Sequence, residues 1–251
     1  MNELTNLKLT PETIKNKRAE VSRLLTQSSP NIKNGDIKII STADLKLLFD
    51  LYDKVFFGER FKTIFKGKLR FSLSRRMTRS AGKTLFPIDI SGIKPENLTI
   101  EIRMGVDFYF RHNLIEGSKN ACGIKTTTGL EALQVIFEHE LCHAIEYICF
   151  GQTNCSAERF KTIAGNLFGH TESHHSLPTN TQIAHQKLGL KIGHNVSFTF
   201  EGKRLKGILY KINKRAVVMV RDKNGQFADS KGNRYAKYYV PLPMLETGGD
   251  L

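Results

Sequence analysis

The chain has 251 residues, a formal net charge of +14 at pH 7 and an ordinary share of apolar residues. This length suits one mid-sized domain plus a small one. No apolar run approaches the roughly 20 residues that a membrane-spanning helix needs, and the N-terminus lacks the charged and then apolar layout of a secretion signal. Four cysteines in a chain this long do not indicate a disulfide framework. We therefore expect an intracellular protein with reduced thiols and no membrane partner.

The first part of the chain, residues 1–40, is predicted to be an N-terminal helical and linker segment. A helix is expected from Pro11 to Leu25, with Thr10 as its N-cap and a proline at its first position. The polar stretch that follows contains Ser, Pro, Asn and Gly, which is typical of a linker.

Residues 41–180 combine helical and strand patterns and are predicted to form an α+β domain. Apolar residues at three- and four-residue spacing predict a helix that begins near Ser41 and ends or breaks at Gly58. Alternating polar and apolar residues at 68–74 and 98–104 predict two half-buried strands.

Two more helices are predicted in this domain, and Gly82 is expected to mark a turn ahead of the second strand. The first helix runs from about Leu130 to Cys149, with Gly151 in a fitting place for its C-cap. The second covers residues 156–168, with Ser156 as its cap.

Residues 187–246 differ in character from the rest. Short apolar stretches at 196–200, 206–212, 216–220 and 238–242 predict strands that are separated by turns. Several short strands in so few residues predict a small β-barrel of the SH3 or Tudor type.

The stretch Phe137-Glu-His-Glu-Leu-Cys-His carries the main chemical signal. His139 and His143 are four residues apart, so a helix places them on one face, where both can bind one metal ion. Glu140 follows the first histidine and can reach a water on that ion without binding it. We therefore predict one catalytic Zn²⁺ ion with two histidine ligands, and Glu140 as the general base that passes a proton to the leaving amine. Glu146 is expected to be a solvated helix charge, with support of a ligand as the alternative.

Several stretches of the chain resemble the SprT-like zinc metalloproteases, the family that includes Spartan. They are residues 48–57, 69–82 and 139–147, followed in the expected order by the helix with Phe160-Lys and by Gly169-His-Thr. The resemblance covers about residues 45–176. It implies a zincin-like protease domain with helices on a small antiparallel sheet. It also implies action on proteins that are bound or crosslinked to DNA, and so a role in DNA–protein crosslink repair.

The chain departs from this family at the third zinc ligand, which is usually a histidine in the pattern His-Gly-x-x-Phe. Counting back from Phe160 places Ser156 at that position, and serine is a poor zinc ligand. The neighbouring Cys155 is a good one, and one extra residue in the loop brings it into place. We predict Cys155 as the third ligand. The alternatives by residue type are His170, His174, His175, Glu158 and Glu172.

The basic excess lies mainly near the C-terminus and favours nucleic acid as a partner. Between residues 187 and 243 there are thirteen Lys and Arg residues against three acids, a net charge of +10. Such an excess attracts polyanions, although a merely soluble basic surface is the alternative. The side chains that we expect to contact DNA are Arg75, Arg76, Arg79, Lys203, Arg204, Lys206, Lys214 and Arg215. For the three arginines, the alternative is a solvated edge of the protease-like part.

Aromatic residues interleave with the basic ones in the C-terminal part and can stack on bases where they are exposed. They are Phe198, Phe200, Tyr210, Phe227, Tyr235, Tyr238 and Tyr239. We expect more than half of them to fill the barrel core.

Three functions remain open: a zinc endopeptidase that acts on DNA-associated proteins, a nucleic-acid-binding protein that has lost catalysis, and a regulatory factor with a structural zinc ion. The sequence does not decide between DNA and RNA, and it does not fix the oligomeric state.

Overall fold

The computed structural model describes residues 2–87, 92–114, 116–117 and 119–247, and it divides the chain into two compact units. The first unit is Met1–Leu177 and the second is Pro178–Leu251. The mixture of helices and small sheets confirms the predicted α+β class. Among the described helices, none has both the length and the apolar content for a bilayer span. Residues 1–40 belong to the first unit and do not form a separate segment.

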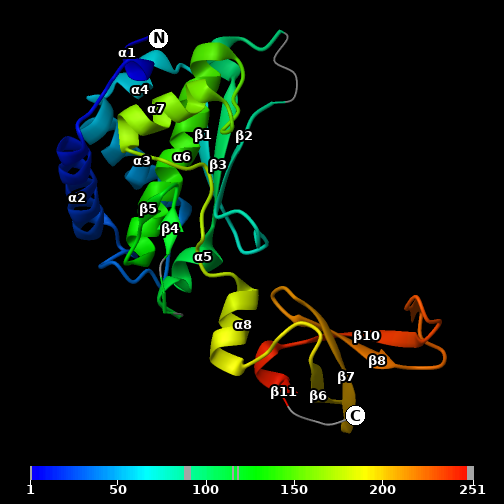
Figure 1. Ribbon diagram of the computed structural model, residues 1–251. Helices are drawn as coiled ribbons and strands as arrows, with labels where there is room; N and C mark the ends of the chain where they lie inside the picture. The colour runs from blue at the N-terminus through cyan, green and yellow to red at the C-terminus, as the bar shows by residue number, and fades with distance from the viewer. Residues whose placement is uncertain (1, 88–91, 115, 118, 248–251) are drawn as a thin grey trace. The chain divides into compact units, whose positions relative to one another are not determined.

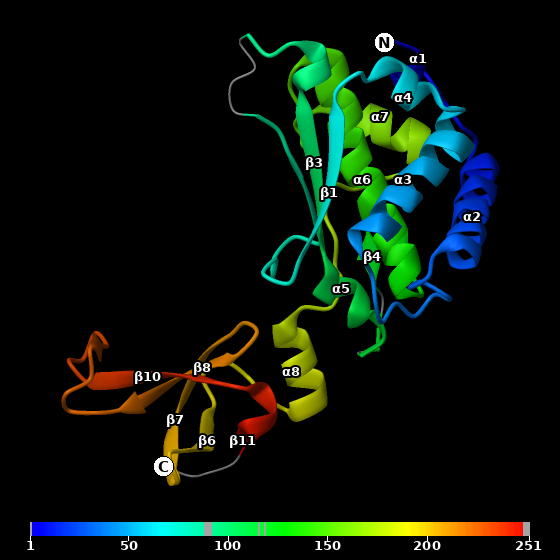
Figure 2. The same cartoon turned by 180° about the vertical axis from the view of Figure 1, so that it is seen from behind.

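The first unit is built around one long central helix, α6 (Gly129–Phe150). The other helices are α1 (Asn2–Thr5), α2 (Pro11–Ser28), α3 (Thr42–Phe57), α4 (Arg60–Ile64), α5 (Val106–Phe110) and α7 (Glu158–Phe168). Short 3₁₀ turns occupy Pro95–Asn97 and His112–Leu114. Figures 1 and 2 show α6 between the small sheet and α2, so the middle of the chain forms the middle of the unit.

The predicted helix caps explain where α2 and α3 begin. Thr10 accepts a hydrogen bond from the Thr13 backbone N–H at 3.2 Å, and Pro11 takes the first position of α2. Ser41 and Asp44 form a reciprocal capping box at the start of α3. Gly58, with a φ of +59°, ends α3 in the left-handed region that glycine adopts without strain. These caps confirm the predicted starts of α2 and α3 and the predicted end of α3, whereas α2 continues past the predicted Leu25 to Ser28.

The predicted start of α7 at Ser156 is wrong. The helix begins at Glu158, and its N-cap position, Ala157, offers no side-chain hydrogen bond. Asn154 competes for this segment, because its side-chain oxygen accepts the Ser156 N–H at 3.0 Å and its carbonyl accepts the Ala157 N–H at 2.9 Å. The tight turn that results makes the loop two residues longer, and the helix two residues shorter, than predicted.

The sheet of the first unit has three strands: β1 (Lys68–Ser74), β2 (Gly82–Leu85) and β3 (Thr99–Gly105), in the order β1-β3-β2. β1 pairs with β3 in parallel, and β2 pairs with β3 antiparallel, so the sheet is mixed and not purely antiparallel as expected. Gly82 does not mark a turn but begins the edge strand β2. A two-stranded hairpin, β4 (Asn120–Ala121) and β5 (Ile124–Lys125), lies apart from this sheet.

A buried charge network ties α2, α3 and α6 together. The Glu138 carboxylate accepts hydrogen bonds from Arg18 Nε at 2.8 Å, from Arg18 Nη2 at 2.7 Å and from the Tyr52 hydroxyl at 2.7 Å. Its side chain is completely buried. A buried carboxylate is tolerated only when it is paired and hydrogen-bonded, as here. These contacts fix the N-terminal helices against α6.

The second unit is an antiparallel sheet with one helix, α8 (Asn180–Leu188). Its strands are β6 (Asn195–Phe200), β7 (Lys203–Ile212), β8 (Ala216–Arg221), β9 (Phe227–Ala228), β10 (Arg234–Val240) and β11 (Glu246–Thr247), with a 3₁₀ turn at Leu242–Met244. The order is β11-β6-β7-β8-β10-β9, and among the described strands no pairing joins the edge strands β11 and β9. The sheet is therefore open in its hydrogen bonding, whereas we expected a closed barrel.

The predicted strands at 196–200, 206–212 and 216–220 are confirmed in β6, β7 and β8. The fourth begins and ends earlier than predicted, because β10 stops at Val240 before a proline that cannot donate to the ladder. The helix α8 was missed. Thr179 and Gln182 form a capping box at its start, which is visible in the sequence. The helix buries only Ala184 among its residues, so no apolar stripe marks it.

We expect Glu138→Gln to lower the free energy of unfolding by about 3–5 kcal/mol, because the Arg18 guanidinium then loses its buried counter-charge. Urea unfolding followed by circular dichroism measures this change. Glu20→Gln, at an exposed position of α2, is the matched control and is expected to change the free energy by less than about 0.5 kcal/mol. Equal unfolding midpoints for the two variants would contradict a structural role for the network.

Candidate metal centre

The central helix α6 carries both predicted histidine ligands in the interior of the first unit. It begins after Thr128, whose hydroxyl accepts a hydrogen bond from the Glu131 backbone N–H at 3.1 Å. It ends at Gly151, whose φ of +71° confirms the predicted C-cap. Apolar residues occur on nearly every face of α6, so its polar residues are withdrawn from water as well.

His139 and His143 lie on the same face of α6, as their spacing predicts. Their ring centroids are 4.9 Å apart, and the ring planes meet at 78°. The Phe160 ring of α7 packs against both imidazoles, with centroid distances of 4.9 Å and 4.5 Å. One aromatic ring therefore restrains the orientation of both histidines.

Cys155 joins the two histidines in a group of three potential metal ligands. One nitrogen of each histidine and the Cys155 sulfur all lie within 4.8 Å of one another. Donors that bind one zinc ion tetrahedrally at about 2.0–2.3 Å are separated by about 3.3–3.8 Å. A small contraction of the group is enough to close it around an ion. The structure therefore brings together the three residues that the sequence proposes as ligands.

A buried carboxylate holds the loop that carries Cys155. Glu146 accepts a hydrogen bond from the Asn154 backbone N–H at 3.1 Å and another from Arg159 Nε at 2.7 Å. The side chain of Glu146 is completely buried, so it is not the solvated helix charge that we expected. It instead holds the backbone of Asn154, the residue before Cys155, and so restrains the position of the cysteine.

A hydroxyl group orients His143. Its Nδ1 atom lies 2.7 Å from Oγ1 of Thr153, in the same loop as Cys155. This contact leaves Nε2 as the ring nitrogen that is available for a metal ion. Ligand histidines in proteins are commonly fixed in this way through their second nitrogen.

Both histidines are held in the neutral form that a metal ion requires. Burial, together with the neighbouring His143, His170 and His175, lowers the pKa of His139 to about 3. Burial also lowers the pKa of His143 to about 4, against the opposing effect of Glu146. Their lone pairs are therefore available at neutral pH without competition from protons.

The predicted general base, Glu140, is buried against the edge strand β2. Thr84 Oγ1 lies 2.7 Å from Oε2 of Glu140 and 3.0 Å from its backbone oxygen, and its hydroxyl can donate to either. Burial raises the pKa of Glu140 to about 7, although the Thr84 hydrogen bonds lower it. A carboxylate with such a pKa suits proton transfer near neutral pH. A Cβ atom at Gly82 would lie 2.6 Å from Oε1, so glycine gives the carboxylate its space.

The alternative third ligands have other environments. His174 is exposed and pairs with Glu172 at 3.3 Å. His175 accepts the Ala81 N–H at 3.1 Å through Nε2 and so fixes the start of β2. His170 belongs to a different group that is described below. Neither ligand group found among the described residues contains Ser156, Glu158, Glu172, His174 or His175.

The predicted DNA-contacting side chains are all on the surface. Arg75, Arg76 and Arg79 are exposed on the segment between β1 and β2. Those of the second unit, also exposed, are Lys203, Arg204, Lys206, Lys214 and Arg215. Arg204 forms an ion pair with Glu246, so part of its charge is neutralised within the unit.

The aromatic residues of the second unit are more exposed than we expected. Of the seven, only Phe198 is buried, so the expectation that more than half would fill the core is wrong. Tyr210 and Tyr239 are each more than 60% exposed. Tyr239 lies opposite the buried Val217 in the β10–β8 register, and Val217 lies opposite Lys211 on β7. This register places Tyr239 and Lys211 on one face of the sheet, and the exposed Tyr210 lies at the β-bulge just before Lys211. We call Tyr210, Lys211 and Tyr239 the tyrosine face.

Sequence reasoning missed several groups that shape the metal centre. Thr84, Thr153 and Cys122 carry no local motif, and their importance follows only from segments that meet in the fold. Glu138 gave a weak signal, because a charged residue within a strongly apolar helix implies a buried partner.

No known protein family, no curated protein and no solved structure matches the chain.

We expect Cys155→Ser to weaken zinc binding by at least about 10-fold, because even the loss of a residue that only supports a ligand costs about 10–100-fold. Competition with a chromogenic chelator measures the affinity. Cys149→Ser is the matched control, since Cys149 lies near the end of α6 outside both ligand groups. If both variants bind zinc as tightly as the natural sequence, Cys155 is not a ligand.

Proposed function

We propose that the first unit is a zinc-dependent endopeptidase of the SprT-like, zincin type. His139, His143 and Cys155 are its metal ligands, and Glu140 is its general base. The observation that supports this most is the position of Cys155, which lies beside the two histidines although the sequence lacks the usual third histidine.

The ligand group fits zinc in number and in chemical type. Two neutral imidazoles and one thiolate form the mixed nitrogen and sulfur set that zinc binds well. Three protein ligands leave a fourth position open, as in catalytic zinc sites. A zinc ion bound there supplies a Lewis acid that acidifies a water molecule and polarises the scissile carbonyl.

The residues of the chain supply proton transfer and substrate alignment. Glu140 accepts the proton of the attacking water and passes it to the leaving amine. Thr84 keeps this carboxylate in place by hydrogen bonding to it at 2.7 Å. Among the described strands β2 pairs only with β3, so its other edge is unpaired. An extended peptide can add to such an edge through main-chain hydrogen bonds, which places it next to Glu140.

The second unit is proposed to bind DNA and so to direct the endopeptidase to DNA-associated or DNA-crosslinked proteins. We propose that its small antiparallel sheet is of the SH3-like type. The net charge of +10 over residues 187–243 supplies sequence-independent attraction to phosphates. The exposed rings of Tyr210 and Tyr239 are suited to stacking on unpaired bases. This combination favours single-stranded over duplex DNA.

A second candidate function is a nucleic-acid-binding protein without catalysis. It is favoured by Ser156, which occupies the position of the usual third histidine, and by the tyrosine face, which needs no metal ion. Metal analysis separates the two candidates. One tightly held zinc ion per chain that is lost in the Cys155→Ser variant supports the endopeptidase, and purified protein without metal supports the binding protein.

We expect Glu140→Gln to lower the rate of proteolysis by about 10²–10⁴-fold, because the water loses its proton acceptor. The assay is cleavage of a protein crosslinked to a DNA oligonucleotide, with zinc content measured on the same samples. Glu158→Gln, at the exposed start of α7, is the control and is expected to cleave at the natural rate. Equal cleavage by the Glu140→Gln variant and the natural protein would reject the proposed role.

The double substitution of Tyr210 and Tyr239 by alanine is expected to weaken binding of a single-stranded oligonucleotide by about 1–3 kcal/mol for each stacked base. Fluorescence anisotropy at fixed salt concentration measures this affinity. Phe150→Ala removes an exposed aromatic ring from the first unit and serves as the control. Unchanged affinity in the double variant would exclude the tyrosine face as the binding surface.

A further inference from the structure

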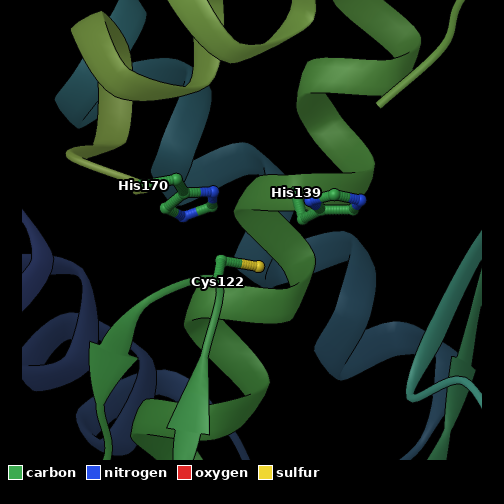
Figure 3. A group of neighbouring side chains, drawn as sticks. All are labelled: Cys122, His139 and His170. Carbon is green, nitrogen blue, oxygen red and sulfur yellow. The ribbon is translucent and has the colours of Figure 1, made fainter. Parts of the chain in front are cut away.

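A second group of metal-binding side chains lies in the interior of the first unit. It consists of Cys122, His139 and His170, with one ligand atom of each within 4.8 Å of the others. Figure 3 shows that they come from three segments: the turn between β4 and β5, the helix α6, and the chain just after α7. The three residues are only 1%, 8% and 7% exposed.

Two buried nitrogen atoms in this group lack a hydrogen-bond partner. They are Nδ1 of His139 and Nδ1 of His170, the two buried side-chain polar atoms left without a partner in the described part of the chain. A buried polar atom without a partner costs about 1–3 kcal/mol. Two such atoms beside one thiol therefore mark a place where one bound ion can satisfy all three groups.

The network around Glu138 determines which nitrogen of His170 carries the proton. Arg18 and Tyr52 donate hydrogen bonds to the Glu138 carboxylate, so this group acts as an acceptor. His170 Nε2 lies 3.1 Å from the same carboxylate and must be the donor. Its Nδ1 atom then keeps a free lone pair. A carboxylate that fixes a histidine through the far nitrogen is the usual support of a metal-binding imidazole.

Backbone hydrogen bonds hold Cys122 next to the segment that carries His170. The Cys122 N–H donates to the carbonyl of His174 at 2.8 Å. In return the Cys122 carbonyl accepts the N–H groups of Thr171 at 3.1 Å and Glu172 at 3.3 Å. The thiol and the imidazole are therefore fixed relative to each other by the main chain and not by flexible side chains.

We propose that Cys122, His139 and His170 form a second metal site, which binds a borderline or soft cation such as Zn²⁺ in the protein interior. A thiolate with two imidazoles selects ions of this kind over magnesium or calcium. The site uses the Nδ1 face of His139, whereas Nε2 remains for the group with His143 and Cys155. A neutral imidazole has one lone pair, so the two sites compete for His139 and only one is filled at a time. The consequence for catalysis rests on the proposed function: an ion in the interior site leaves the endopeptidase inactive.

The test isolates the interior site by removing two ligands of the other one. The protein with His143→Ala and Cys155→Ser is titrated with Co²⁺, whose bond to a thiolate gives a near-ultraviolet charge-transfer band. We expect one Co²⁺ per chain with this band. Adding Cys122→Ser is expected to abolish the band, and adding Cys142→Ser, at a buried position of α6 outside both groups, is expected to preserve it.

Two results would overturn the proposal. One is a folded double variant, judged by circular dichroism, that binds no Co²⁺, and the other is a charge-transfer band that survives Cys122→Ser. If Cys122→Ser prevents folding, His170→Gln replaces it, because the longer glutamine amide reaches the position of Nε2 and still donates to Glu138, while the Nδ1 ligand is lost. Failure of the proposed peptidase is distinguishable, since that activity and its Glu140→Gln variant are measured with His143 and Cys155 in place.

Discussion

The burial of α6 is the constraint on which the first unit depends. Within three turns this helix withdraws three carboxylates, Glu138, Glu140 and Glu146, from water, together with His139. Isolated charges in such a place are strongly unfavourable, so each must find a partner or stay neutral. Each carboxylate does find one, and the partner comes from a different part of the chain in every case.

These partnerships arrange the unit around the candidate metal centre. Glu138 binds Arg18 and Tyr52, and this draws α2 and α3 onto one side of α6. Glu140 binds Thr84, which places the edge strand β2 along the site. Glu146 binds the loop of Cys155.

The buried histidines around the site, two on α6 and one after α7, differ from the carboxylates in how far their hydrogen-bonding capacity is satisfied. His143 contacts Thr153 through one nitrogen, while Nδ1 of His139 and Nδ1 of His170 have no partner among the described residues. In a helix whose acids are all satisfied, unsatisfied nitrogens beside two thiols suggest that metal binding is the function for which they are kept. The two ligand groups meet at His139, which makes this residue the most constrained position of the site.

Local signals in the sequence were sufficient for the starts of α2 and α3, for the ends of α3 and α6, and for part of the site. The caps at Thr10, Ser41 and Gly58 follow from turn and capping chemistry, and the spacing of His139 and His143 follows from helix periodicity. Cys155 lies beside the two histidines, as predicted from its place next to the missing histidine, although residue type alone also allowed more distant histidines and glutamates. These features depend on residues that are close together along the chain.

Features that depend on distant segments could not be predicted in this way. The parallel pairing of β1 with β3 and the open order of the second sheet are decided by long-range hydrogen bonds. Burial of Glu146 depends on Arg159 and Asn154 folding back over it. The exposure of Tyr210 and Tyr239 depends on which face of each strand turns inward, and alternation alone does not say which face is covered.

Zinc K-edge X-ray absorption tests the central claim most directly, since it reports the atoms around the ion. The measurement is best made on protein with Cys122→Ser, so that no sulfur from the interior group contributes. The account predicts one sulfur at about 2.3 Å and nitrogen or oxygen neighbours at about 2.0–2.1 Å. A zinc ion surrounded only by nitrogen and oxygen would contradict it, because Cys155 would then have no part in the site.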